Sequence, residues 1–106
     1  MVNRFDVYLA GLDAVPTKDS KTTRPCVVIS PNEMNAHLAS VMIAPLSAST
    51  TKYPTRIAVN FLNNERMIVL DQIRTVDKVR LVKKIGEIDK SAHKETIDRL
   101  QEMFAE

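Results

Sequence analysis

The sequence predicts an α+β fold, in which one mainly antiparallel β-sheet packs against a C-terminal amphipathic helix. Two observations support this prediction. Between residues 6 and 70 the chain contains short runs of β-branched and other apolar residues that are bounded by turn-forming residues. From residue 89 the apolar residues recur at spacings of three and four, which is the period of a helix. Many short strands followed by one terminal helix are typical of α+β domains.

The strand-like segments differ in how they are expected to be buried. Residues 26–30 and 41–45 are continuously apolar, which predicts strands covered on both faces in the middle of the sheet. Residues 56–59 alternate between polar and apolar side chains, as a half-exposed strand does. Asn63-Asn64 is predicted to be the turn of a hairpin that leads into residues 67–70.

Helical structure is expected at two places. Pro31 precedes helix-compatible residues, which favours a single helical turn. The C-terminal helix should begin near Asp89, and either Asp89 or Ser91 is expected to cap its first amides. Its buried stripe is predicted to consist of His93, Ile97, Leu100 and Phe104.

Composition limits the possible functions. A chain of 106 residues is expected to form one domain over residues 1–106, and 44% apolar with 26% charged residues is ordinary for a soluble globular protein. The apolar runs are too short to cross a bilayer and no signal-type segment precedes the first strand, so a cytoplasmic location is expected and no membrane contact.

The single Cys26 is expected to be a small buried hydrophobe. A net charge of +2 is too small to indicate a polyanion-binding protein, so any such site must be local.

Two polar junctions lie beside the apolar runs. Thr23-Arg24-Pro25 precedes residues 26–30, and residues 70–78 place four charged side chains and a glutamine among a few buriable aliphatic residues. Together they resemble the MazF/PemK/Kid family, which consists of small bacterial toxins of type II toxin–antitoxin systems. The likeness runs essentially end to end. It implies a strongly curved antiparallel sheet, a small SH3-like barrel of the CcdB/PemK type, with short helices and a C-terminal helix.

The resemblance also implies an activity. Family members are metal-independent, sequence-selective endoribonucleases, or mRNA interferases, which cleave single-stranded RNA and inhibit translation and growth. Cleavage without a metal needs a base for the ribose 2′-hydroxyl, an acid for the leaving oxygen and a cation near phosphorus, and its expected product is a 2′,3′-cyclic phosphate. Neither His37 nor His93 belongs to a metal-ligand spacing, so no metal and no cofactor are expected.

The resemblance implies four catalytic candidates. Arg24 matches the arginine of the family's Thr-Arg-Pro motif, and its planar guanidinium can grip two phosphate oxygens. Asp19 aligns with a family glutamate and could act as the base or orient Arg24, while Asp71 matches an aspartate that some members use as the base. Ser47 stands where the family has a hydroxyl that could hydrogen-bond to a phosphate oxygen. Structural roles stay open for all of them, such as a salt bridge for Arg24 and a strand-end cap for Ser47.

The RNA-binding candidates come mainly from two loops, at residues 14–22 and 47–55, whose basic side chains are expected to line one groove. Tyr53 could stack on an unpaired base, and Gln72 could read a base edge. The complete predicted set is Lys18, Lys21, Thr23, Lys52, Tyr53, Arg56 and Gln72.

Three positions depart from the family pattern. Phe5 and Thr17 replace glycines, and Asp19 replaces a glutamate that is one methylene longer. Because glycine permits backbone conformations that other residues resist, the loop that carries Asp19 could follow a different path. The predicted fold is unaffected, since these positions lie at the edges of the apolar pattern.

Two other functions remain open. A catalytically weakened member would only bind its antitoxin, and a CcdB-like toxin would bind DNA gyrase through its C-terminal residues, although residues 101–106 lack the Trp-Gly-Ile ending associated with that group. The resemblance further implies a homodimer and a cognate antitoxin, whose acidic and initially disordered segment covers the groove.

Overall fold

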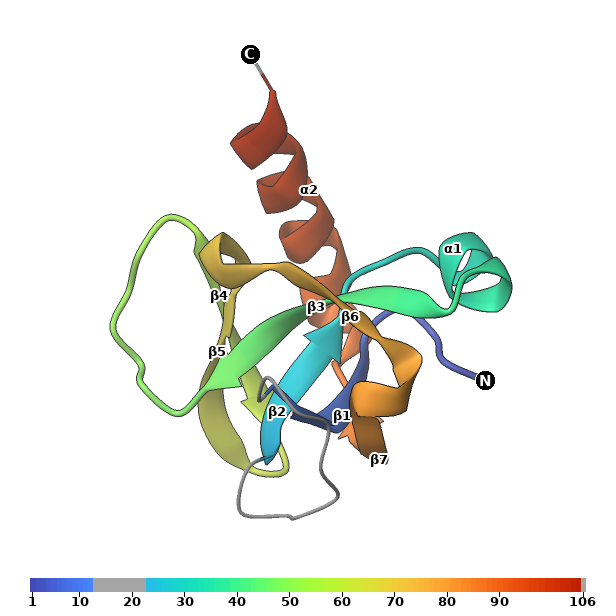
Figure 1. Ribbon diagram of the computed structural model, residues 1–106. Helices are drawn as coiled ribbons and strands as arrows, with labels where there is room; N and C mark the ends of the chain where they lie inside the picture. The colour runs from blue at the N-terminus through green and yellow to red at the C-terminus, as the bar shows by residue number, and fades with distance from the viewer. Residues whose placement is uncertain (13–22, 106) are drawn as a thin grey trace.

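The computed structural model describes residues 1–12 and 23–105 (Figure 1). Within these residues, seven strands and two helices are connected in places by single turns of 3-10 helix. The strands are β1 (Asp6–Gly11), β2 (Thr23–Val28), β3 (Ser40–Ser47), β4 (Arg56–Phe61), β5 (Asn64–Val69), β6 (Arg74–Asp77) and β7 (Leu81–Glu87). The helices are α1 (Asn32–His37) and α2 (His93–Phe104), and the 3-10 turns are η2 (Leu70–Gln72), η3 (Lys78–Arg80) and η4 (Lys90–Ala92). The predicted α+β fold with a C-terminal helix is confirmed.

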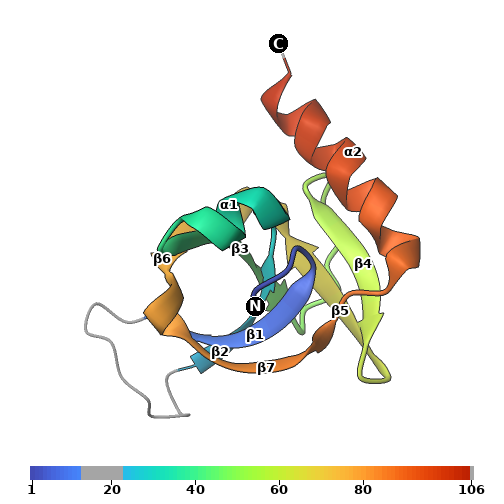
Figure 2. The same ribbon diagram turned by 90° about the vertical axis from the view of Figure 1, so that its right-hand side faces the viewer.

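One antiparallel sheet curls into a half-barrel. Its strand order is β4-β5-β3-β2-β1-β7, and β6 pairs with the other half of β3. Figure 2 shows the curl, in which β6 and α1 lie across from β1 and β7, while α2 runs obliquely along the β4–β5 hairpin. The curvature implied by the family resemblance is therefore confirmed.

The sheet has a hydrophobic core on each face. Val27 and Ile29 belong to a larger core beneath α2, whereas Cys26 and Val28 belong to a smaller one shared by β1, β2, β3 and β6. Alternate residues of a strand point to opposite faces, so a segment between two cores has to be apolar at every position. This explains the apolar residues 26–29 and confirms that the predicted segment 26–30 is buried, with Ser30 as its one polar member.

The hairpin turn lies one residue earlier than predicted. Phe61 pairs with Asn64, and the two residues between them, Leu62 and Asn63, have φ values of 50° and 64°. Positive φ at both central positions is the signature of a type I′ turn. The buried alternation of Ile57, Val59 and Phe61 fixes this register, because a slip of one residue would turn all three side chains to solvent.

Helix α2 is confirmed, but two details of its prediction are wrong. Ala92 occupies the N-cap position without a side-chain cap, and the Asp89 carboxylate accepts a hydrogen bond from the Ser91 hydroxyl (3.1 Å). Met103 packs on the core, while Phe104 is 75% exposed. The C-terminal part of α2 projects beyond the sheet (Figure 1), and Met103 is the last apolar side chain of the helix that packs on the core. Neither helix within residues 1–12 and 23–105 is long and apolar enough to span a membrane.

Candidate functional site

An open groove of about 560 Å³ lies where β2 begins and β3 ends. These two strand ends are neighbours because the strands are antiparallel, with Cys26 opposite Pro45. The start of β4, the middle of β5 and η2 complete the walls. The lining residues are Leu12, Arg24, Pro25, Pro45, Leu46, Ser47, Ala48, Arg56, Arg66, Val69 and Gln72. Sequence reasoning predicted four of these as site residues, namely Arg24, Ser47, Arg56 and Gln72.

Arg24 is held at the mouth of the groove by its own strand. It is the second residue of β2, pairs with Ala10 of β1, and donates from Nη1 to the Thr23 carbonyl at 3.4 Å. A guanidinium carries five N–H donors, so this one long hydrogen bond leaves the Arg24 guanidinium with donors that can bind an anion. The Thr23 side chain is buried, which gives Thr23 a part in placing Arg24.

Arg56 is positioned by two neighbours, Tyr53 and Asp71. Its guanidinium lies over the Tyr53 ring, 4.5 Å from the ring centroid. Its Nε is 3.7 Å from Asp71 Oδ1, and the same oxygen accepts a 2.8 Å hydrogen bond from the Thr55 hydroxyl. Asp71 is not among the described residues that line the groove, so it reaches the groove through Arg56. This arrangement holds Arg56 in place before any ligand binds.

Ser47 and Gln72 supply the neutral polar groups of the groove. Ser47 ends β3, and its hydroxyl oxygen accepts a hydrogen bond from the Ser49 amide at 3.1 Å, as the strand-end cap alternative predicts. A hydroxyl can accept and donate together, so Ser47 can still donate to an anion. Gln72 is the last residue of η2 and is exposed, with an amide that can both donate and accept.

Arg66 is a groove residue that sequence reasoning missed. It lies in β5 opposite Val59, at the polar beginning of a strand whose second half is buried. A periodicity argument assigns such a residue to a solvated strand end, and only the packing of β5 beside β3 brings it to the groove. Arg24, Arg56 and Arg66 give the groove three guanidinium groups, and none of its described lining residues is acidic.

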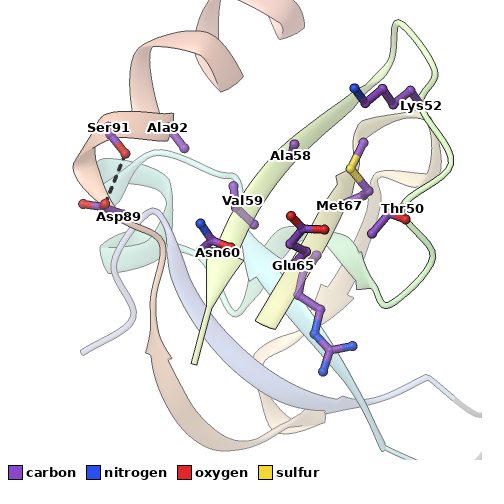
Figure 3. A pocket seen from close by; sticks show the side chains of 11 residues that line it. Thr50, Lys52, Ala58, Val59, Asn60, Glu65, Met67, Asp89, Ser91 and Ala92 are labelled. Carbon is purple, nitrogen blue, oxygen red and sulfur yellow. Dashed lines mark hydrogen bonds between the residues drawn. The ribbon is translucent and has the colours of Figure 1, made fainter. Parts of the chain in front are cut away.

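Lys52 is expected to share one groove with Arg56, but it is not among the described residues that line this groove. Lys52 lines a second cavity of about 380 Å³, over the β4–β5 hairpin (Figure 3). Asp19, Lys18 and Lys21 fall outside the described residues. Across the described part of the chain, no three His, Cys, Asp or Glu side chains come together as a metal site would require.

The chain is similar to known proteins along most of its length. Residues 3–104 match a family model described as PemK-like, MazF-like toxin of type II toxin-antitoxin system. The chain is 33% identical over 97 residues to a protein named Endoribonuclease MazF from Staphylococcus epidermidis, covering 86% of this chain and 81% of the relative.

Two solved structures show the same fold. The first is an endoribonuclease in complex with its cognate antitoxin from Mycobacterial species, with a TM-score of 0.81, 22% identity, and coverage of 96% of this chain and 93% of the other. The second is MazE-MazF from Deinococcus radiodurans, with a TM-score of 0.78, 16% identity, and coverage of 98% and 95%.

Proposed function

This chain belongs to the PemK-like, MazF-like toxins of type II toxin–antitoxin systems, and on that premise we propose that it is a metal-independent endoribonuclease that cuts single-stranded RNA. The observation that supports this most directly is the groove with three guanidinium groups and no acidic residue among its described walls. Such a groove attracts a phosphodiester backbone although the whole chain carries a net charge of only +2. Cutting mRNA within a short sequence would stop translation and growth.

The reaction is an internal transfer at phosphorus. The ribose 2′-oxygen attacks phosphorus while a carboxylate takes its proton, the bond from phosphorus to the 5′-oxygen breaks, and that oxygen takes up a proton. The products are a 2′,3′-cyclic phosphate and a 5′-hydroxyl. Arg24 stabilises the charge that develops on the non-bridging oxygens, and Ser47 donates to one of them.

Asp19 and Asp71 are the two candidates for the carboxylate base. The contacts of Asp71 with Thr55 and Arg56 support a positioning role for it, in which it aims Arg56 at the RNA backbone. With Asp71 so engaged, Asp19 is the better candidate for the base.

The groove and Tyr53 beside it support a preference for single-stranded RNA. Tyr53 is 52% exposed and has Arg56 on one face of its ring, so the remaining surface can stack on an unpaired base. Gln72 can hydrogen-bond to a base edge, which only an unpaired base presents fully. Cleavage would therefore require an unpaired, locally extended strand.

A basic groove also suits a regulatory partner. The similar endoribonuclease from Mycobacterial species is in complex with its cognate antitoxin. For this chain we propose an antitoxin whose acidic, initially disordered segment folds into the groove and excludes RNA. We further expect a homodimer that acts in the cytoplasm, where its RNA substrate is found.

The test is cleavage of a long mixed-sequence RNA in the presence of EDTA, with the cut ends mapped. Wild-type protein should produce discrete cuts that end in cyclic phosphate, and Arg24→Ala should abolish them. Lys94→Ala is the matched control, since it removes one positive charge from the exposed Lys94–Asp98 pair of α2. Folded wild-type protein that leaves RNA intact would contradict the proposal and favour a member that only binds its antitoxin or gyrase.

A further inference from the structure

The second cavity lies beside the groove on the β4–β5 hairpin. Its walls are the loop around Thr50 and Lys52 on one side and η4, with Asp89 and Ser91, on the other (Figure 3). Arg66 lines both the groove and this cavity, so the two sites are adjacent and share one cation. A strand of RNA that leaves the groove past Arg66 reaches this cavity next.

The cavity combines an apolar floor with a polar rim. Ala58 and Met67 pair across the hairpin and provide the floor, with Met67 only 3% exposed. Asn60 and Glu65 form the next pair of outward-facing residues and add an amide and a carboxylate. Sites for small molecules typically have a few hundred Å³ of volume, apolar surface and a small number of convergent polar groups. A volume of about 380 Å³ therefore suits one nucleotide.

The charges of the rim have separate roles. Lys52 and Arg66 can bind a phosphate, whereas the carboxylates of Glu65 and Asp89 repel one. A carboxylate only accepts hydrogen bonds, so the group that faces Glu65 or Asp89 has to donate. Adenine, cytosine and guanine carry an exocyclic amino group that donates. The only donor on the pairing edge of uracil, N3–H, lies between two carbonyl oxygens that a carboxylate repels.

We propose that this cavity binds the base of a nucleotide that flanks the cleaved bond, and that it selects adenine, cytosine or guanine over uracil. Lys52 and Arg66 hold the phosphate that links this nucleotide to the groove, Glu65 and Asp89 accept from the exocyclic amine, and the base lies on Ala58 and Met67. The inference rests on the proposed function, because it adds a base-selecting subsite to an RNA-cleaving groove.

The first experiment measures binding without cleavage. Short 2′-O-methyl oligomers of A, C and U cannot be cut, because the methyl group blocks the attacking oxygen. Wild-type protein should bind oligo(A) or oligo(C) about tenfold more tightly than oligo(U), since one well-placed base contact discriminates by this order. Glu65→Gln and Asp89→Asn keep the size of these exposed side chains, and each should reduce that ratio. Glu95→Gln, an exposed carboxylate of α2, is the control that should keep it.

The second experiment maps cleavage sites of the same variants on mixed-sequence RNA. Wild-type protein should disfavour uracil at one flanking position, and Glu65→Gln should relax this preference while cutting still depends on Arg24. Cleavage with an unchanged preference in Glu65→Gln and Asp89→Asn would overturn the subsite and leave the proposed function standing. Base-selective binding without any cleavage would support the subsite and overturn the proposed endoribonuclease function. Equal binding of all three oligomers by wild-type protein would overturn the subsite as well.

Discussion

The ring of Phe5 lies flat against the imidazole of His93, with centroids 3.8 Å apart and planes 13° from parallel. Phe5 has a φ of 73°, in the left-handed region that favours glycine. Its amide donates to the Val28 carbonyl at 2.7 Å and its carbonyl accepts from the Ile88 amide at 2.9 Å. The chain thus keeps a backbone shape that suits the family's glycine, and a buried aromatic contact with α2 offsets the strain.

This relationship predicts an unusual order of stabilities. Phe5→Ala should lower the free energy of unfolding by about 3–5 kcal/mol, because it removes a buried ring. Phe5→Gly should be the more stable of the two by about 1 kcal/mol, since glycine adopts positive φ without strain. Urea denaturation of both variants measures the difference. Alanine proving more stable than glycine at this position would contradict the assigned backbone conformation.

Gly86 has no room for a side chain. A Cβ atom at this position would lie 2.8 and 2.9 Å from two carbons of the Phe61 ring, and its φ of 158° is one that L side chains rarely adopt. Gly86→Ala should therefore lower the free energy of unfolding by about 1–3 kcal/mol. Thermal unfolding of Gly86→Ala, Phe61→Leu and the double variant separates the contact with the Phe61 ring from the strain of the backbone conformation. If the ring contact dominates, the double variant should lose less stability than the sum of the single variants, whereas strict additivity would point to backbone strain alone.

Asp71 can be tested as a positioning residue against a role as the base. If Asp71 positions Arg56, Asp71→Asn should reduce the cleavage rate several-fold. The double variant Asp71→Asn with Arg56→Ala should then cleave almost as fast as Arg56→Ala alone, because the two residues act as one unit. If Asp71 is the base, Asp71→Asn should reduce the rate by about 10²–10⁴-fold whether or not Arg56 is present. Single-turnover rates on one oligonucleotide in the four combinations decide between these roles, and Asp19→Asn provides the comparison.

Burial of Cys26 predicts a loss of stability in alkali. Burial raises the pKa of its thiol from 9.0 to about 11. Between these values the unfolded chain ionises first and binds fewer protons than the folded protein, so stability falls as pH rises from 9 toward 11. At 1.36 kcal/mol per pKa unit, the loss amounts to about 2–3 kcal/mol. Denaturation at pH 8 and pH 10.5 should show a steeper fall for wild-type protein than for Cys26→Ala, and equal falls would contradict a raised pKa.

Much of the fold could be predicted because its signals are local. Residues 26–29 are apolar at every position since each is covered on one face or the other, and Ile97 and Leu100 recur with the helical period because α2 has one buried side. The motif around Arg24 and the polar segment after Leu70 were also readable, since strand ends and turns concentrate polar groups. These patterns determined the order and type of the elements.

Features that depend on strand register and sheet curvature could not be predicted from local patterns. The hairpin turn fell at Leu62 and Asn63 because pairing between β4 and β5 places it there, and Phe104 is exposed because the sheet ends before the helix does. Arg66 lines the groove although the sequence did not predict it there, and Lys52 lines the second cavity. Local patterns in the sequence were sufficient to predict which elements form and which residue types are available for RNA chemistry. Which side chains meet follows from the folded arrangement alone, because it depends on contacts between strands far apart in the chain.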